Sequence, residues 1–106
     1  MKPEPTFDRD GYPTEETLEV IRKWTHRDLR GLAEFVCEAW CYPDYAKLDG
    51  RALELHTGGW SGNESLLGAL QEQTIFWAMC WRKSERGGHY WFELPATSKE
   101  ALEGER

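Results

Sequence analysis

The sequence has no long hydrophobic run and little positive charge. No stretch approaches the roughly 20 consecutive apolar residues that a membrane-spanning helix needs, and the first 13 residues, MKPEPTFDRDGYP, lack the apolar core of a secretory signal peptide. Thirteen basic residues stand against 19 acidic ones, for a net charge of -6. A nucleic-acid-binding domain needs a concentrated positive patch. We therefore expect a soluble, cytoplasmic protein that does not bind membranes and for which duplex nucleic acid is a disfavoured partner.

Cysteines are few, and common catalytic motifs are missing. Of three cysteines, Cys37 and Cys41 lie four residues apart in a helical pattern, which indicates free thiols in a reducing compartment. A tetrahedral zinc site would need Cys80 or a histidine from elsewhere to complete it, and we predict no metal site. No G-x-S-x-G elbow, H-E-x-x-H or paired C-x-x-C motif is present. The sequence therefore leans away from an enzyme, and we expect no cofactor.

The 106 residues are enough for one domain. Residues 1–13 hold three of the five prolines and are predicted to form an extended N-terminal arm. Residues 14–95 contain periodic helix and strand patterns and are predicted to form a single domain. Residues 96–106 are polar and are predicted to form a C-terminal tail.

Two helices are predicted in the first half of that domain. Thr14 can cap a short first helix, and Thr25 carries the signal for a second one, with Asp28 three residues later. The second helix is expected to end near Cys41, because Pro43 disfavours helical geometry just before it. The following Tyr-Pro-Asp-Tyr segment is predicted to be a loop.

The second half predicts a strand, a helix and a hairpin. Alternation over 51–57 indicates a strand, and Ser61 with Glu64 has the spacing of a capping box for a third helix. The β-prone runs 74–81 and 89–94 flank a glycine turn and are predicted to pair as a hairpin. The fold class is therefore predicted to be α+β, with a small three-stranded antiparallel sheet, helices mainly on one face, and the order α-α-β-α-β-β.

The segment LHTGGWSGNE places Trp60 among glycines between a strand end and a helix start. The indole either fills the core of the domain or stacks on a ligand, and the sequence leaves both open. The same geometry can hold a phosphate on free amides, but the loop lacks the lysine of a phosphate loop. A tight turn that leads into a capped helix is the favoured interpretation.

When successive residues of the predicted hairpin are assigned to opposite faces, both faces are largely apolar or aromatic. If helices cover one face, then the arm, a second subunit or a ligand is expected to cover the other. The predicted binding residues combine this hairpin with the glycine loop, and they are His56, Gly59, Trp60, Ser61, Asn63, Arg86, His89, Tyr90 and Trp91.

Several blocks of the sequence resemble a known group of proteins. HTGGWSGNE, FWAMCW and RGGHYWFEL, with the opening TFDRDGYPTEETL, are similar to small proteins encoded by bacteriophages and prophages, and the resemblance extends from about Phe7 to Leu94. It implies a setting, the infected bacterial cytoplasm, and no catalytic residues. By analogy with other small phage proteins, it suggests an accessory factor that binds host machinery such as a defence protein.

Two hypotheses of function follow from these residues. The leading one is a non-enzymatic binding protein that engages a host protein, or a second copy of itself as a homodimer, through the aromatic and glycine-loop surface. A lower-ranked one is a small hydrolase or nuclease that uses His56, His89 and a nearby carboxylate. The latter requires both imidazoles to lie on the same face of the sheet.

Another hypothesis, ranked second and ahead of the hydrolase, is a small-molecule binding or sequestering protein of nucleotide type. The glycine-loop amides would hold a phosphate, and Trp60 or Trp91 would stack on a base. This hypothesis needs Arg51, Arg82 and Arg86 to converge at the loop, because the protein is acidic overall.

Overall fold

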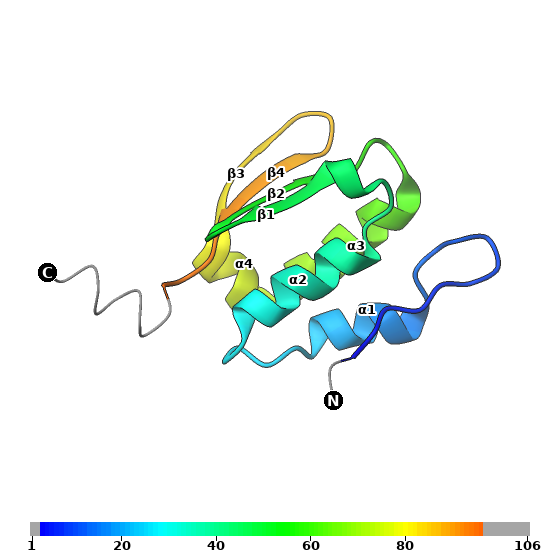
Figure 1. Ribbon diagram of the computed structural model, residues 1–106, viewed down its shortest axis with the longest axis horizontal. Coiled ribbons are helices and arrows are strands. Elements are labelled where there is room, and N and C mark those ends of the chain that lie inside the picture. The colour runs from blue at the N-terminus through cyan, green and yellow to red at the C-terminus, as the bar shows by residue number, and fades with distance from the viewer. Residues whose placement is uncertain (1–2, 97–106) are drawn as a thin grey trace, which may run out of the picture.

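The computed structural model of the protein describes residues 3–96 and places a four-stranded antiparallel sheet over a layer of helices (Figure 1). The C-terminal tail predicted for 96–106 lies outside the described residues except for Ala96. The elements are, in chain order, α1 (Glu15–Arg22), α2 (Leu29–Ala39), the 3-10 turn η1 (Pro43–Tyr45), β1 (Ala46–Asp49), β2 (Ala52–His56), α3 (Ser61–Glu72), α4 (Thr74–Cys80), β3 (Trp81–Glu85) and β4 (His89–Glu93).

The first two helices form where the sequence predicts them. The Thr14 hydroxyl accepts a hydrogen bond from the amide of Thr17 and caps α1, as expected. The second helix begins later than predicted, because the Asp28 carboxylate, and not Thr25, accepts a hydrogen bond from the amide of Gly31. An aspartate at this position also complements the positive end of the helix dipole.

The start of α3 differs from the prediction in one detail. Trp60 occupies the N-cap position without a side-chain hydrogen bond, and Ser61 is the first residue of the helix. The predicted capping box of Ser61 and Glu64 is therefore wrong. The helix itself is present, and its apolar stripe of Leu66, Leu67 and Leu70 is buried as the spacing predicts.

The segment 74–80, predicted to be a strand, is the helix α4. The Gln73 side chain caps it by accepting a hydrogen bond from the amide of Phe76 at 3.0 Å. Phe76 and Cys80, one turn apart, point into the core together. Burial of that pair and the cap outweigh the β propensity of the aromatic residues, because such propensity depends on packing context.

The sheet has four strands, not three, in the order β1-β2-β4-β3. The missed strand is β1, which lies between the predicted loop at 42–45 and the predicted strand at 51–57, and it pairs with β2 from Ala46↔Leu55 to Asp49↔Ala52. The predicted strand at 89–94 is confirmed as β4, but its hairpin partner is β3 at Trp81–Glu85, which shares only Trp81 with the predicted strand 74–81. A tight Gly50 turn with φ +61° joins β1 to β2.

The helices lie on one side of the sheet, as predicted (Figure 1). On that side Leu53, Leu55 and Phe92 are buried against the helical layer, which contributes Phe35 and Leu32 among others. The opposite face is not the apolar surface that the predicted alternation suggested. It carries charged residues on every strand, so this face can remain exposed to water without another layer packed over it.

The N-terminal arm packs against the start of α1 through a threonine cluster. The Thr6 amide donates to the Thr17 hydroxyl at 2.8 Å, and the hydroxyls of Thr6 and Thr14 lie 2.6 Å apart. Phe7 and Pro13 form an isolated bridge that closes the tip of the arm into a turn. None of the helices between residues 3 and 96 has the length and apolar character needed to cross a bilayer.

Candidate functional site

The outer face of the sheet gathers side chains from two distant sequence blocks. Burial alternates along β2, so His56 projects away from the buried Leu55. The antiparallel register places His56 directly opposite His89, and Glu54 opposite Trp91. Both histidines therefore lie on one face of the sheet, which is the condition that the hydrolase hypothesis requires.

The two imidazoles are in contact. His56 Nδ1 lies 2.8 Å from His89 Nδ1, so one ring donates its N–H and the other accepts. The second ring nitrogen of His56, Nε2, lies 3.3 Å from the Glu54 carboxylate. The three side chains form a chain of polar contacts, Glu54–His56–His89, on the open face.

Trp91 completes this cluster. Its ring centroid lies 5.8 Å from that of His56 in an edge-on arrangement and 6.3 Å from that of His89. The Lys83 ammonium stands 4.4 Å from the Trp91 ring centroid, within cation–π range. We call His56, His89 and Trp91 the histidine–tryptophan surface.

Two glycine-rich loops meet at the end of this surface. The Thr57 amide donates to the carbonyl of Gly88 at 2.9 Å, which ties the loop after β2 to the turn before β4. Gly88 has φ +82°, and a Cβ there would lie 2.1 Å from the Thr57 hydroxyl oxygen. Only glycine fits at this position without a shift of Thr57. The segments HTGGWSGNE at 56–64 and RGGHYWFEL at 86–94 are thus neighbours in space.

Trp60 packs against its own domain and does not join the histidine–tryptophan surface. The indole is half-buried and stacks on Tyr12 of the N-terminal arm, with ring centroids 5.1 Å apart and planes inclined by 18°. On its other side it lies over Gly62, where a Cβ would come within 2.2 Å of the ring. The N-terminal arm therefore covers Trp60, whose indole the sequence allowed either to fill the core or to stack on a ligand.

Two of the predicted binding residues, Asn63 and Tyr90, are packed inside the domain and do not lie on the outer face of the sheet. Asn63 is fully buried, and its amide accepts from the Cys41 amide and donates to the carbonyls of Cys41 and Thr57. Tyr90 lies on the inner face, with its ring edge-on to Trp77 at 6.1 Å. Neither side chain belongs to the outer face, because Asn63 is buried in the first turn of α3 and Tyr90 points to the opposite side of β4 from His89 and Trp91.

The remaining predicted residues lie at exposed ends of elements. Gly59 is exposed with φ +77°, Ser61 is exposed at the first position of α3, and Arg86 is exposed in the β3–β4 turn. They border the two loops but make none of the ring contacts of the histidine–tryptophan surface.

The arginines required by the nucleotide hypothesis do not converge at the glycine loop. Arg82 Nη2 lies 3.1 Å from the Glu93 carboxylate, and Arg51 Nη2 lies 4.0 Å from the same oxygen. Glu93 is at the far end of β4 from His89, opposite the start of β2. Of the three arginines, only Arg86, in the β3–β4 turn, borders the glycine loop, so the nucleotide hypothesis is left with that loop and one arginine.

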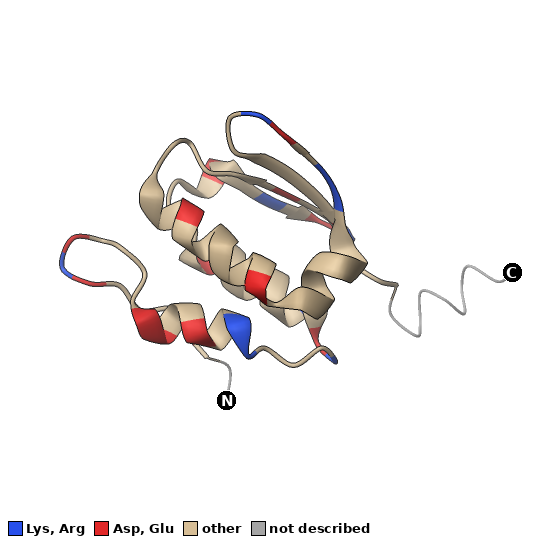
Figure 2. Ribbon diagram, turned by 180° about the vertical axis from the view of Figure 1, so that it is seen from behind, with Lys and Arg blue, Asp and Glu red and all other residues tan. Residues whose placement is uncertain are grey.

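A mixed ring of charge surrounds the histidine–tryptophan surface. Figure 2 shows basic and acidic residues interleaved along the strands. Lys83, Glu85 and Glu93 are about half exposed, and Glu54 is 41% exposed against 24% for His56. Sequence reasoning did not single out Lys83 as a site residue. Glu54 is one of the candidates for the carboxylate of the hydrolase hypothesis, and strand alternation over 51–57 places it on the same face as His56.

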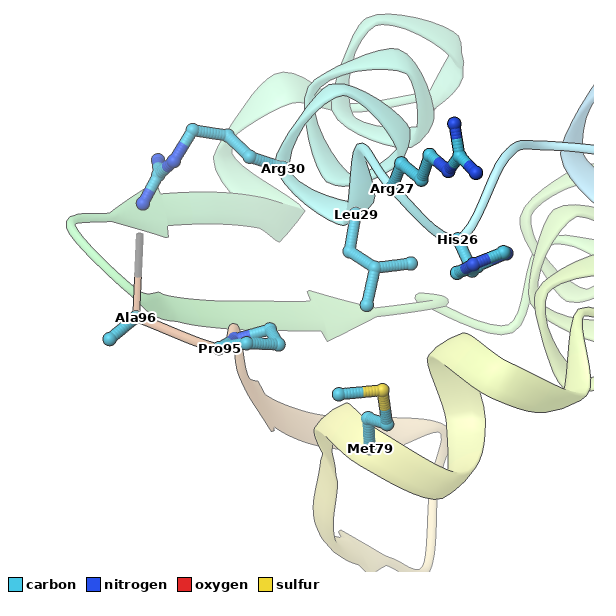
Figure 3. Close-up of a pocket in the computed structure, with 7 residues that line it drawn as sticks. All are labelled: His26, Arg27, Leu29, Arg30, Met79, Pro95 and Ala96. Atoms are coloured by element: carbon cyan, nitrogen blue, oxygen red, sulfur yellow. The ribbon is translucent and has the colours of Figure 1, made fainter. Parts of the chain in front are cut away.

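A separate cavity of about 230 Å³ lies at another part of the molecule (Figure 3). It is lined by His26, Arg27, Leu29, Arg30, Met79, Pro95 and Ala96. Arg30 is engaged there, because its Nη2 donates to the carbonyl of Gly50 at 2.8 Å. None of the predicted binding residues lines this cavity.

The cysteines remain separate from the histidine–tryptophan surface. All three are free thiols, and burial next to Glu34 and Glu38 raises the pKa of Cys37 to about 11. Burial likewise raises the pKa of Cys80 to about 11. Within residues 3–96, no three His, Cys, Asp or Glu side chains are grouped so that they could hold a metal ion.

Comparison of the chain with protein-family models, with curated proteins and with solved structures finds no match.

Proposed function

We propose that the protein is a non-enzymatic binding protein whose histidine–tryptophan surface engages a partner protein. In the setting implied by the phage resemblance, the partner is a host protein such as a defence factor. The observation that carries the proposal is the convergence of His56, His89 and Trp91, from two separate sequence blocks, on the sheet face that the helices leave open.

The composition of this face supports the proposal. Interface centres are enriched in aromatic residues and surrounded by a polar rim. Trp91 is half-buried at the centre, and Lys83 and Glu93 stand about half exposed around it. Rim charges of both signs favour a partner with a complementary pattern, because such complementarity sets specificity and association rate.

Two further features support a pre-organised surface. The outer side chains are presented by a strand pair in continuous register, from Ala52↔Glu93 to His56↔His89. The contact between Thr57 and Gly88 fixes the two loops to each other. Little ordering is needed on binding, and pre-organisation of this kind increases affinity.

The experiment is capture of partners from infected and uninfected bacterial lysates, followed by affinity measurement with the purified partner. Trp91→Ala should weaken binding roughly 30-fold, as expected for an aromatic hot spot. Phe7→Ala is the matched control, because Phe7 is an aromatic residue that is 45% exposed on the N-terminal arm. Equal affinity of the wild type and Trp91→Ala would contradict the proposal. Sedimentation velocity of the protein alone would identify a second copy as the partner.

A second candidate function is acid–base hydrolysis, for example of a phosphodiester. The contact of His56 with both His89 and Glu54 favours it, since a carboxylate can orient one imidazole while the pair transfers a proton. His56→Gln and His89→Gln should each abolish hydrolysis of bis-p-nitrophenyl phosphate, whereas His26→Gln should not. Absence of any hydrolysis by the wild-type protein would remove this candidate.

A further inference from the structure

We propose that the Nδ1 atoms of His56 and His89 together chelate one divalent transition-metal ion, of which Zn²⁺ is the representative. The inference goes beyond the proposed protein binding and does not depend on it. The two rings face each other across adjacent strands in direct register, and their Nδ1 atoms lie 2.8 Å apart. A cross-strand pair of this kind offers two neutral imidazole ligands to one ion.

The geometry needs little adjustment. With Zn–N bonds of about 2.0–2.1 Å, two ligands of a tetrahedral ion lie about 3.3 Å from each other. The present Nδ1–Nδ1 separation of 2.8 Å therefore has to widen by roughly half an ångström, and both rings have to turn so that the two Nδ1 lone pairs point at one ion. The ring that now donates through Nδ1 has to lose that proton and carry its N–H on Nε2 instead, an exchange that solvent allows. Both side chains are only partly buried, so small χ rotations allow this without disturbing the core.

The Glu54 contact is an independent observation that fits metal binding. Histidines that bind metal usually donate the N–H of their other ring nitrogen to a carboxylate, which fixes the tautomer and the ring orientation. His56 Nε2 lies 3.3 Å from Glu54 Oε2, and this contact leaves Nδ1 free to face His89. The arrangement is the carboxylate–histidine half of such a site.

The chemistry of the pair also defines the ion. Imidazole suits Zn²⁺, Cu²⁺ and Ni²⁺, whereas Mg²⁺ and Ca²⁺ prefer oxygen ligands. Within residues 3–96 no third His, Cys, Asp or Glu completes a set, so water fills the remaining positions of the ion. The Lys83 ammonium over Trp91 adds positive charge near the pair and limits the affinity.

The test is isothermal titration of Zn²⁺ into the full chain, purified without a histidine tag. We expect one ion per chain, with no binding of Mg²⁺. Either His56→Gln or His89→Gln should weaken Zn²⁺ binding about 100-fold, because the second ligand acts intramolecularly. Glu54→Gln should weaken it about tenfold, as loss of an orienting carboxylate does. Circular dichroism confirms that each variant is folded.

Matched controls separate this site from other ligands. His26→Gln removes the third histidine, and Cys41→Ser removes a half-exposed thiol; both should bind Zn²⁺ as the wild type does. Equal binding by the wild type and His56→Gln, or a loss in His26→Gln as large as in His56→Gln, would overturn the proposal. Lys83→Gln should strengthen binding, because it removes the nearby positive charge.

Quenching of tryptophan fluorescence locates the ion in an experiment that does not depend on partner binding. Bound Cu²⁺ should quench the fluorescence of Trp91, since the ring centroids of Trp91 and both histidines lie within 6.3 Å. Trp91→Phe should lose most of this quenching and keep Zn²⁺ binding. Quenching that is unchanged in Trp91→Phe would place the ion elsewhere. Loss of partner binding in Trp91→Ala with intact Zn²⁺ binding distinguishes the two proposals.

Discussion

Replacement of Gly62 by alanine should dislodge Trp60 and destabilise the protein. A Cβ at this position would lie 2.2 Å from the Cη2 and Cζ3 atoms of the indole, far inside van der Waals contact. The indole is rigid and is held on its other side by Tyr12, at a centroid distance of 5.1 Å. It therefore cannot stay between Tyr12 and α3, and the stack of the arm on the helix is lost.

The magnitude follows from three contributions. Loss of the Tyr12–Trp60 stack costs about 0.5–1.5 kcal/mol. Exposure of a half-buried indole costs about 1–2 kcal/mol more, whereas alanine in a helix gains up to about 1 kcal/mol over glycine. The net loss in unfolding free energy is about 1–2 kcal/mol. Gly68→Ala is the matched control in the same helix, because nothing lies within 4 Å of its Cβ position.

The assay is urea unfolding followed by far-ultraviolet circular dichroism. Gly68→Ala should be stabilised by about 1 kcal/mol, so the two variants should differ by about 2–3 kcal/mol. The effects of Gly62→Ala and Tyr12→Ala should be strongly non-additive, because both act on the same stack. Equal stabilisation by Gly62→Ala and Gly68→Ala would refute the packing of Trp60 on α3.

Three other predictions test the buried polar groups. Asn63→Ala should lower the unfolding free energy by about 2–4 kcal/mol, because it strips partners from the Cys41 amide and the Thr57 carbonyl; Ser65→Ala, on the exposed side of the same helix, is the comparison in urea. Gln73→Ala should cost about 1–3 kcal/mol through loss of the cap on Phe76, and an unchanged thermal midpoint would contradict it. The raised pKa of Cys37, about 11 instead of 9.0, means that its thiolate is scarce in the folded state. At pH 8 the rate of Cys37 alkylation, measured by mass spectrometry, should be roughly 100-fold lower in the folded protein than in urea. The rate in the folded protein should rise about tenfold per pH unit. Equal rates in the two states would refute the burial of this thiol.

Local patterns predicted most of the helices for a physical reason. The α1 cap at Thr14 and the apolar stripe of α3 depend on residues within one or two turns, so they can be recognised from sequence alone. The error at α4 has the opposite origin. Its aromatic residues favour a strand locally, but burial of Phe76 and Cys80 on one side requires a helix, and only the packed core imposes that burial.

The sequence predicted the types of residue in the candidate site, but it did not predict which of the nine candidates lie together on the outer face of the sheet. His56, His89 and Trp91 were singled out from their blocks, and strand alternation was sufficient to place His89 and Trp91 on one face. Tyr90 and Asn63 lie away from the outer face, because Tyr90 packs against Trp77 on the helical side and Asn63, in the first turn of α3, is held by hydrogen bonds to the distant Cys41.

By itself, the sequence determined the α+β class, the glycine turns and the residue types of the candidate site, since these depend on local propensity and on the chemistry of single side chains. Only the tertiary structure decided that β2 lies beside β4, that His56 therefore meets His89, and that Tyr12 covers Trp60. These contacts join residues far apart in the chain. They are selected by the common burial of Leu55, Phe92 and their neighbours, a property of the whole core that no single segment contains.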